Sequence, residues 1–184
     1  MHPAGAAYFK EDIRKLCKVL IKRVKEAGVK VVMNTEVTPE YVEKFNPDAL
    51  FVAIGSNELC PPIKGMELPN VVMAIDAELH PEKLGKRIAI MGGGLVGAEA
   101  AVSFHHEGKE CSIIEMKSAV AEEVNSFYRG GLMPEIEKAA KCYVNTKVKE
   151  IVKEGVLCER EGEEFVVKQI LLYVLLDSEL RMIK

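Results

Sequence analysis

The fold of this chain is decided by residues 87–97, which read RIAIMGGGLVG. The first five form a mostly apolar run, typical of a central strand in a parallel sheet with helices on its faces. Small and apolar residues after the glycines predict a helix over 95–107, ended by Gly108. A second apolar run predicts a parallel strand over 111–115. This order of strand, glycine turn, helix and strand is typical of the first unit of a Rossmann-type sheet.

The glycines of this turn have the G-x-G-x-x-G spacing that suits contact with the pyrophosphate of a dinucleotide. Gly92 permits the tight turn, and Gly94 has no side chain to hold a phosphate away from the backbone. Gly97 lets the helix pack closely on the sheet, and the N–H groups that begin this helix attract anions. The predicted cofactor-binding residues of the turn are Gly92, Gly93, Gly94, Leu95, Val96 and Gly97. The alternative is a turn that serves packing only.

Glu115 closes the second strand, close to the spacing of about 20 residues at which an acidic side chain binds the adenosine ribose. Its carboxylate would repel a 2′-phosphate, so the sequence favours NAD(H) over NADP(H). Lys117 lies two residues further on and moderates that preference.

The residues before this unit predict further α/β structure. Amphipathic spacing indicates a helix over 10–27, and a proline after a capping threonine indicates a short helix over 39–44. Apolar runs predict strands over 29–33 and 49–54. A loop rich in proline and glycine follows, and we place a domain boundary between this loop and Gly85.

The residues after the unit predict a helix that begins at Met133 and then a series of short strands. Turn residues separate these strands, so we expect an antiparallel meander. The extended segments are 142–145, 148–153, 156–160 and 164–168.

Composition excludes several classes of function. A net charge of −3 gives no footprint for nucleic acid or an anionic membrane. The longest apolar run, 170–176, is far shorter than the ~20 residues of a membrane-spanning helix, and the start of the chain does not read as a signal peptide. None of the five cysteines forms a C-x-x-C pair, so we predict no metal ligand. A cytoplasmic protein is the expectation.

Tyr143 and Lys147 have the spacing of the catalytic pair of short-chain dehydrogenases. That chemistry needs the two side chains one helical turn apart, about 6 Å along the axis. The segment between them reads as extended, which would separate them by ~13 Å. We therefore predict no catalytic residue.

Residues 86–115, preceded by Asn34-Thr35-Glu36-Val37 and Val52-Ala53-Ile54-Gly55, resemble the pyridine nucleotide-disulfide oxidoreductase superfamily. The nearest resemblance is to NADH:flavin oxidoreductases of the 2-enoate reductase and 2,4-dienoyl-CoA reductase type. It covers roughly residues 10–175 and implies a Rossmann-like FAD/NAD(P)-binding α/β fold with a parallel sheet, helices and an antiparallel β-meander.

The resemblance implies three further features of the site. Hydride would pass from NADH to FAD, and the complete enzyme would reduce an enoate or enoyl thioester. Glu99 would lie near the nicotinamide, with a solvated acid of the first helical turn as the alternative. Gly55 would lie where the backbone nears the flavin.

The chain departs from the family where FAD phosphates should bind. Before Gly55 it has only Gly5 and Gly28, so the second glycine loop is absent. The segment 32–37 recurs in similar form at 143–148, which suggests two related half-units. We therefore expect a partial FAD-type domain over 1–84, an NAD(H)-binding Rossmann domain over 85–168, and a truncated strand over 169–184 that returns to the FAD-type domain.

Two functions remain open at this stage. One is the NADH-binding section of a flavin-dependent oxidoreductase, inactive alone, whose partners are the missing flavin and barrel domains or subunits. The other is a non-catalytic nucleotide-binding or assembly module. In either case the apolar strands 49–54 and 170–176 would lack a cover, so we expect a homo-oligomer.

Overall fold

The strand before the glycine turn lies inside a five-stranded parallel sheet. The computed structural model describes residues 3–55, 58, 60–168 and 171–174. The order of the strands across the sheet is β1-β8-β2-β3-β4, with every neighbouring pair parallel. Their bounds are Val71–Met73 for β1, Arg87–Met91 for β2, Glu110–Ile114 for β3, Ala140–Tyr143 for β4 and Leu171–Val174 for β8.

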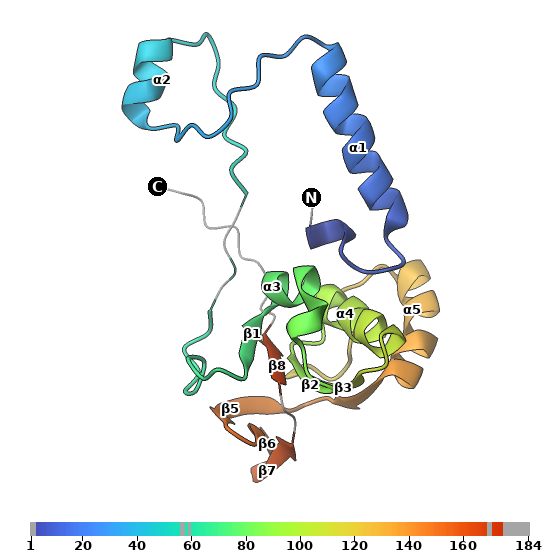
Figure 1. Ribbon diagram of the computed structural model, residues 1–184. Helices are drawn as coiled ribbons and strands as arrows, with labels where there is room; N and C mark the ends of the chain where they lie inside the picture. The colour runs from blue at the N-terminus through green and yellow to red at the C-terminus, as the bar shows by residue number, and fades with distance from the viewer. Residues whose placement is uncertain (1–2, 56–57, 59, 169–170, 175–184) are drawn as a thin grey trace.

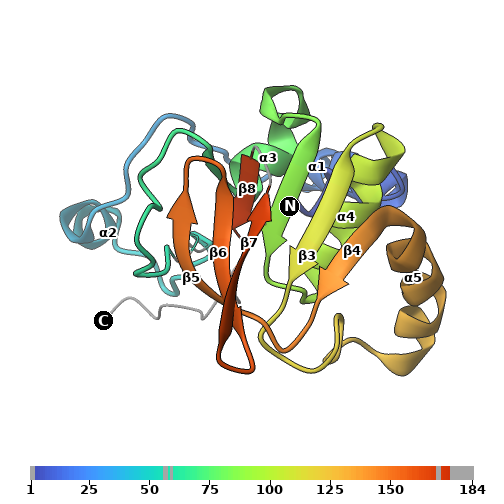
Figure 2. The same ribbon diagram turned by 90° about the horizontal axis from the view of Figure 1, so that it is seen from below.

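The two faces of this sheet have different covers. Helices α3 (Ala74–Leu79), α4 (Leu95–His106) and α5 (Ser126–Ala139) lie on one face, and an antiparallel sheet lies on the other (Figures 1 and 2). That second sheet has the order β5-β6-β7, with bounds Lys147–Val152, Gly155–Arg160 and Glu163–Lys168.

Alternate residues of β2 fill two separate apolar cores because successive side chains of a strand point to opposite faces. Ile88 and Ile90 pack with α4 and α5, whereas Ala89 and Met91 pack with β5 to β7. All four are at most 5% exposed. The apolar run in the sequence is therefore explained by burial on both faces, as predicted.

An arm extends from this body and carries helices α1 (Glu11–Glu26) and α2 (Pro39–Phe45), as Figure 1 shows. Both helices match the sequence prediction. Thr38 caps α2, since its hydroxyl accepts the main-chain N–H of Tyr41 at 3.2 Å. The amphipathic α1 buries none of its residues.

The strands predicted over 29–33 and 49–54 were wrong, because the structure has no strand in either segment. A strand forms only beside a hydrogen-bonding neighbour, and no described residue pairs with these segments. Their apolar side chains are instead exposed, reaching 93% for Phe51.

Other boundaries also differ from the prediction. The strand over 171–174 does not leave for a separate FAD-type sheet but lies between β1 and β2 in the Rossmann sheet. The first segment of the expected meander, β4, joins the parallel sheet beside β3. Sequence pattern indicates that a segment is extended but not which sheet supplies its partner.

Helix α5 begins at Ser126 rather than at Met133 and contains Pro134 in its interior. Asn125 caps it by accepting the N–H of Phe127 at 3.0 Å. The proline had suggested a first turn, but Leu132 and Ile136 on either side of it are buried. Their burial helps to stabilise a helix that continues through the proline.

Candidate functional site

The three glycines of the G-x-G-x-x-G motif, Gly92, Gly94 and Gly97, differ in what requires glycine at each position. Gly92 has a φ of 107°, a backbone conformation that residues other than glycine rarely adopt. A Cβ at Gly97 would overlap the carbonyl oxygen of Gly92, so this glycine lets α4 approach the end of β2. A Cβ at Gly94 would meet nothing within 4 Å, and the φ of Gly94 is an ordinary −64°. Neither backbone conformation nor packing within this chain requires glycine at position 94.

Gly94 is the N-cap of α4, and its carbonyl accepts the N–H of Ala98 at 3.0 Å. The N–H groups of the first turn of a helix have no acceptor within the helix, and they carry partial positive charge. The open space at Gly94 therefore lies where an anion would be stabilised.

The carboxylate of Glu115 lies against this turn. One oxygen accepts the N–H of Gly93 at 2.6 Å, and the other accepts the N–H of Lys117 at 2.8 Å. These bonds fix the carboxylate at the end of β3 beside the glycines. The position agrees with the one from which an acid can reach a ribose at the turn.

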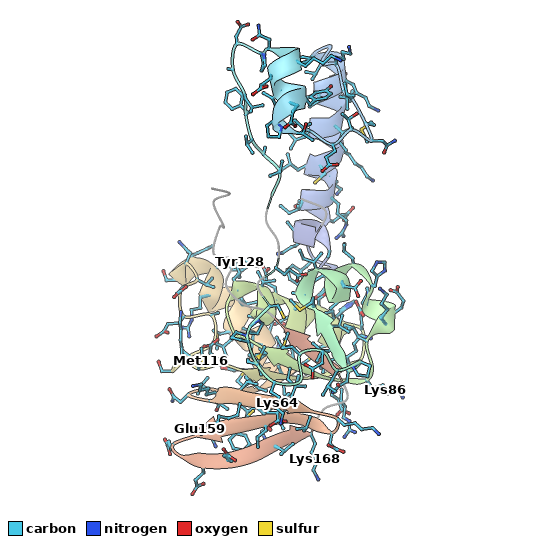
Figure 3. All side chains as sticks on the ribbon, turned by 90° about the vertical axis from the view of Figure 1, so that its left-hand side faces the viewer. Lys64, Lys86, Met116, Tyr128, Glu159 and Lys168 are labelled. Carbon is cyan, nitrogen blue, oxygen red and sulfur yellow. The ribbon has the colours of Figure 1, made fainter. Side chains whose placement is uncertain are left out.

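A cleft of about 950 Å³ opens beside the turn. It is bounded by the glycines, the loop after β3 and the start of α5. Residues of the segments 61–63 and 146–148, which lie outside the parallel sheet, complete the lining. In Figure 3, Tyr128 lies on the side of the body toward the arm and Met116 on the side toward β5 to β7. The lining residues include Pro61, Ile63, Gly92, Gly93, Gly94, Leu95, Glu115, Met116, Lys117, Glu122, Glu123, Tyr128, Thr146 and Val148.

Glu99 is buried, with 4% of its surface exposed, so it is not the solvated acid of the alternative reading. One carboxylate oxygen pairs with the ammonium of Lys10, and the other accepts the hydroxyl proton of Tyr128 at 2.7 Å. Glu99 therefore connects the base of the arm to a side chain that lines the cleft. Its proximity to a nicotinamide stays a prediction.

Four predicted site residues are absent from the cleft lining: Gly97 and Glu99, described above, and Val96 and Gly55. Val96 lies on α4 with its side chain half exposed. Gly55 has a φ of 75° and open space around a would-be Cβ, but it belongs to the arm. The structure does not bring Gly55 to the glycine turn.

Sequence reasoning missed the contribution of α5 and of the loop before it. Tyr128, Glu122 and Glu123 line the cleft although they carry no motif. The available signal was the crossover itself, because the helix after the second strand of such a unit begins near the glycine turn. The misplaced start of α5 hid this relation.

Tyr143 and Lys147 do not share a helix, which agrees with the extended segment predicted between them. Tyr143 ends β4 and Lys147 begins β5, with Asn145 in the left-handed region between them. Within the described residues, no group of three or more His, Cys, Asp or Glu side chains could hold a metal ion. No helix of the described chain is long and apolar enough to cross a membrane.

The hydrogen bond between Tyr128 and the buried Glu99 gives a pH-dependent prediction. Burial, followed by the hydrogen bond to Glu99 and its negative charge, raises the pKa of Tyr128 from 10.0 to about 12. Between those values the unfolded chain has lost a proton that the folded chain retains. The free energy of unfolding should therefore fall as the pH rises from about 10 to about 12, and this contribution is fully present below about pH 10.

The measurement is a comparison of wild type with Tyr128→Phe by urea unfolding across this pH range. The extra loss of stability at high pH should be absent from the variant. In a titration followed by tyrosinate absorbance, Tyr128→Phe should remove a tyrosine that ionises with a pKa of about 12. Identical high-pH titration curves for the two proteins would contradict the assignment.

Known proteins are similar to this chain in sequence. The family model described as pyridine nucleotide-disulphide oxidoreductase matches residues 6–174. A bilirubin reductase of Mediterraneibacter gnavus is 32% identical over 156 residues, which is 84% of this chain and 24% of that protein. A cinnamate reductase of Clostridium sporogenes is 28% identical over 173 residues, covering 90% of this chain and 25% of its own length.

The fold is also shared with a solved structure. A 2-naphthoyl-CoA reductase matches 94% of this chain and 26% of its own, with a TM-score of 0.85 and 22% identity. The chain thus spans about a quarter of the length of these relatives. The match to the family model covers nearly all of the described residues and confirms the resemblance found in the sequence. This chain belongs to the pyridine nucleotide-disulphide oxidoreductase family.

Proposed function

We propose that this chain is the NADH-binding section of a flavin-dependent oxidoreductase. The observation that supports the proposal most directly is the open space at Gly94. Its side-chain position is open toward a cleft at the start of α4, although neither φ nor packing demands glycine there. A pyrophosphate at that point would meet main-chain N–H groups and the positive end of the helix. Backbone conformation accounts for Gly92 and packing accounts for Gly97, but neither explains Gly94.

Glu115 supports the choice of NADH as the dinucleotide. Its carboxylate is held beside the turn, where a ribose bound to the same site would present its hydroxyls. An additional phosphate on that ribose would bring like charges together. A bound nicotinamide dinucleotide would supply a hydride, while the residues of this chain bind and orient it.

The residues of this chain do not fit the diphosphate of FAD. The sequence holds one strand–glycine-turn–helix unit, and that unit forms the cleft described above. Gly55 has the left-handed backbone of a close approach but stands on the arm without such a unit. We propose that the flavin is held by protein outside this chain, and that the complete enzyme passes hydride from NADH to FAD.

The names of relatives support a proposal for the substrate class of the complete enzyme. Cinnamate is an enoate, and the relative that matches 90% of this chain is a cinnamate reductase. The solved structure that matches 94% of the chain is a 2-naphthoyl-CoA reductase, and naphthoyl-CoA is an acyl thioester. We propose reduction of an enoate or enoyl thioester, a reaction that needs parts beyond this chain.

The arm supports the proposal that the flavin-binding part packs against it. The side chains of α1 and of residues 29–33 and 49–54 expose a large apolar surface. The 2-naphthoyl-CoA reductase shares this fold over 94% of the chain at a TM-score of 0.85, whereas a bacillithiol disulfide reductase covers 65% at 0.54. The high coverage of the first match supports the proposal that the arm belongs to a larger fold.

A second candidate function is a nucleotide-binding or assembly module without catalysis. The absence of a second glycine loop from this sequence favours it for the chain taken alone. The two candidates agree on NADH binding and differ in whether hydride leaves the bound dinucleotide.

Paired substitutions in the turn test the site. Gly94→Val should leave the free energy of unfolding close to that of wild type because its side chain has space, and should abolish NADH binding by filling the pyrophosphate position. Gly97→Ala is the control for packing, and it should destabilise the fold because its Cβ overlaps the Gly92 carbonyl. Calorimetric titration with NADH and thermal unfolding provide the two measurements. NADH binding by Gly94→Val at wild-type affinity would refute the site.

Flavin content tests the proposal that the flavin is held outside this chain. The purified chain should be colourless, bind NADH, and leave added FAD unreduced under anaerobic conditions. Visible absorbance of a co-purified flavin, or FAD reduction by NADH, would contradict the proposal that flavin is held elsewhere.

The exposed arm predicts self-association of the isolated chain. Apolar side chains such as Phe51 and Ile54 are 93% and 72% exposed, and such surface tends to pair with a second copy. Light scattering over a range of concentrations should show a homo-oligomer, and Phe51→Ser combined with Ile54→Ser should shift it toward monomer. A wild-type monomer at every concentration would count against this.

A further inference from the structure

The loop after β3 carries an ion pair on the rim of the cleft. The ammonium of Lys117 pairs with the carboxylate of Glu123, and both residues line the cleft. Their side chains are 47% and 72% exposed, so both are accessible to a ligand. Glu122 lines the same rim.

The position of Lys117 is fixed relative to the proposed ribose site. Glu115 accepts the main-chain N–H of Lys117 at 2.8 Å through one oxygen and that of Gly93 through the other. The segment therefore starts at the carboxylate that would bind the adenosine ribose. Lys117 is the cation of this rim placed closest in sequence to that carboxylate.

A 2′-phosphate adds about two negative charges at neutral pH, and a lysine beside the ribose would ordinarily stabilise them. Here the charge of Lys117 is already balanced by Glu123. The cleft is lined by three carboxylates, Glu115, Glu122 and Glu123, and by two lysines, Lys117 and Lys147, so negative charge is in excess.

We propose that Glu123 is a specificity-determining residue that excludes 2′-phosphorylated dinucleotides by neutralising Lys117. The inference rests on the proposed function, because it assumes a dinucleotide in this cleft. It assigns the discrimination to a pair of side chains beyond Glu115. It also explains how a lysine so near the ribose is compatible with preference for NADH.

The competing explanation is an ordinary surface ion pair that only steadies the loop. Such pairs contribute at most about 1 kcal/mol to stability. Removing one would change thermal unfolding slightly, and it would alter the affinities for NADH and NADPH by the same factor. The ratio of the two dissociation constants therefore distinguishes a role in specificity from a role in structure.

The test measures dissociation constants for NADH and NADPH with wild type and Glu123→Gln at low ionic strength. Because one negative charge is removed near the 2′-phosphate, the ratio Kd(NADPH)/Kd(NADH) should fall about fivefold to tenfold. The change should shrink in high salt, since exposed charges are screened. An unchanged ratio would overturn the inference.

Two further variants complete the design. Glu135→Gln is the matched control, because Glu135 pairs with Lys138 at 2.7 Å on α5 and neither residue lines the cleft. It should leave the ratio as in wild type. Adding Lys117→Met to Glu123→Gln should cancel the gain for NADPH, and a gain that persists would refute the role of Lys117. Absence of NADH binding by wild type would refute the proposed function itself.

Discussion

The close approach of α4 to the end of β2 is the constraint on which the site depends. Gly97 lies against the carbonyl of Gly92 with no room for a Cβ, and Gly92 needs a positive φ to make the turn. This contact directs the first turn of α4, with its unpaired N–H groups, into the cleft. Glu115 then binds Gly93 and holds the end of β3 to the same turn. The packing of one helix on one strand thus creates the charge pattern that suits a diphosphate.

Charge is arranged differently at the two ends of the cleft. At the arm side, Glu99 is buried between Lys10 and Tyr128, so its charge is balanced within the protein. At the rim after β3, the acidic side chains are exposed, and Glu123 balances Lys117. A buried carboxylate needs such partners because burial without them is costly. An exposed one acts mainly on approaching ligands, which is the basis of the role that we propose for Glu123.

The arm shows what happens to apolar sequence without a neighbour. Residues 29–33 and 49–54 have the composition of strands but pair with no residue that the structure describes, and α1 exposes its apolar side chains. In contrast β8, a short strand distant in sequence from β2, pairs with both β1 and β2. Strand formation depends on a partner for its main-chain hydrogen bonds, so composition alone predicts an extended tendency rather than a strand.

The sequence by itself determined the Rossmann unit, the need for glycine at positions 92 and 97, and the family. The contact of Gly94 with a diphosphate stays a prediction. These features are local: a turn that needs glycine, an apolar run buried on both faces and an acid at a fixed spacing all lie within a single supersecondary unit. Only the tertiary structure decided the position of β8, the start of α5 and the cleft contacts of Tyr128 and Glu123. Each of these depends on which distant segment lies alongside, and the spacing of residues in one segment carries no information about its neighbour across the fold.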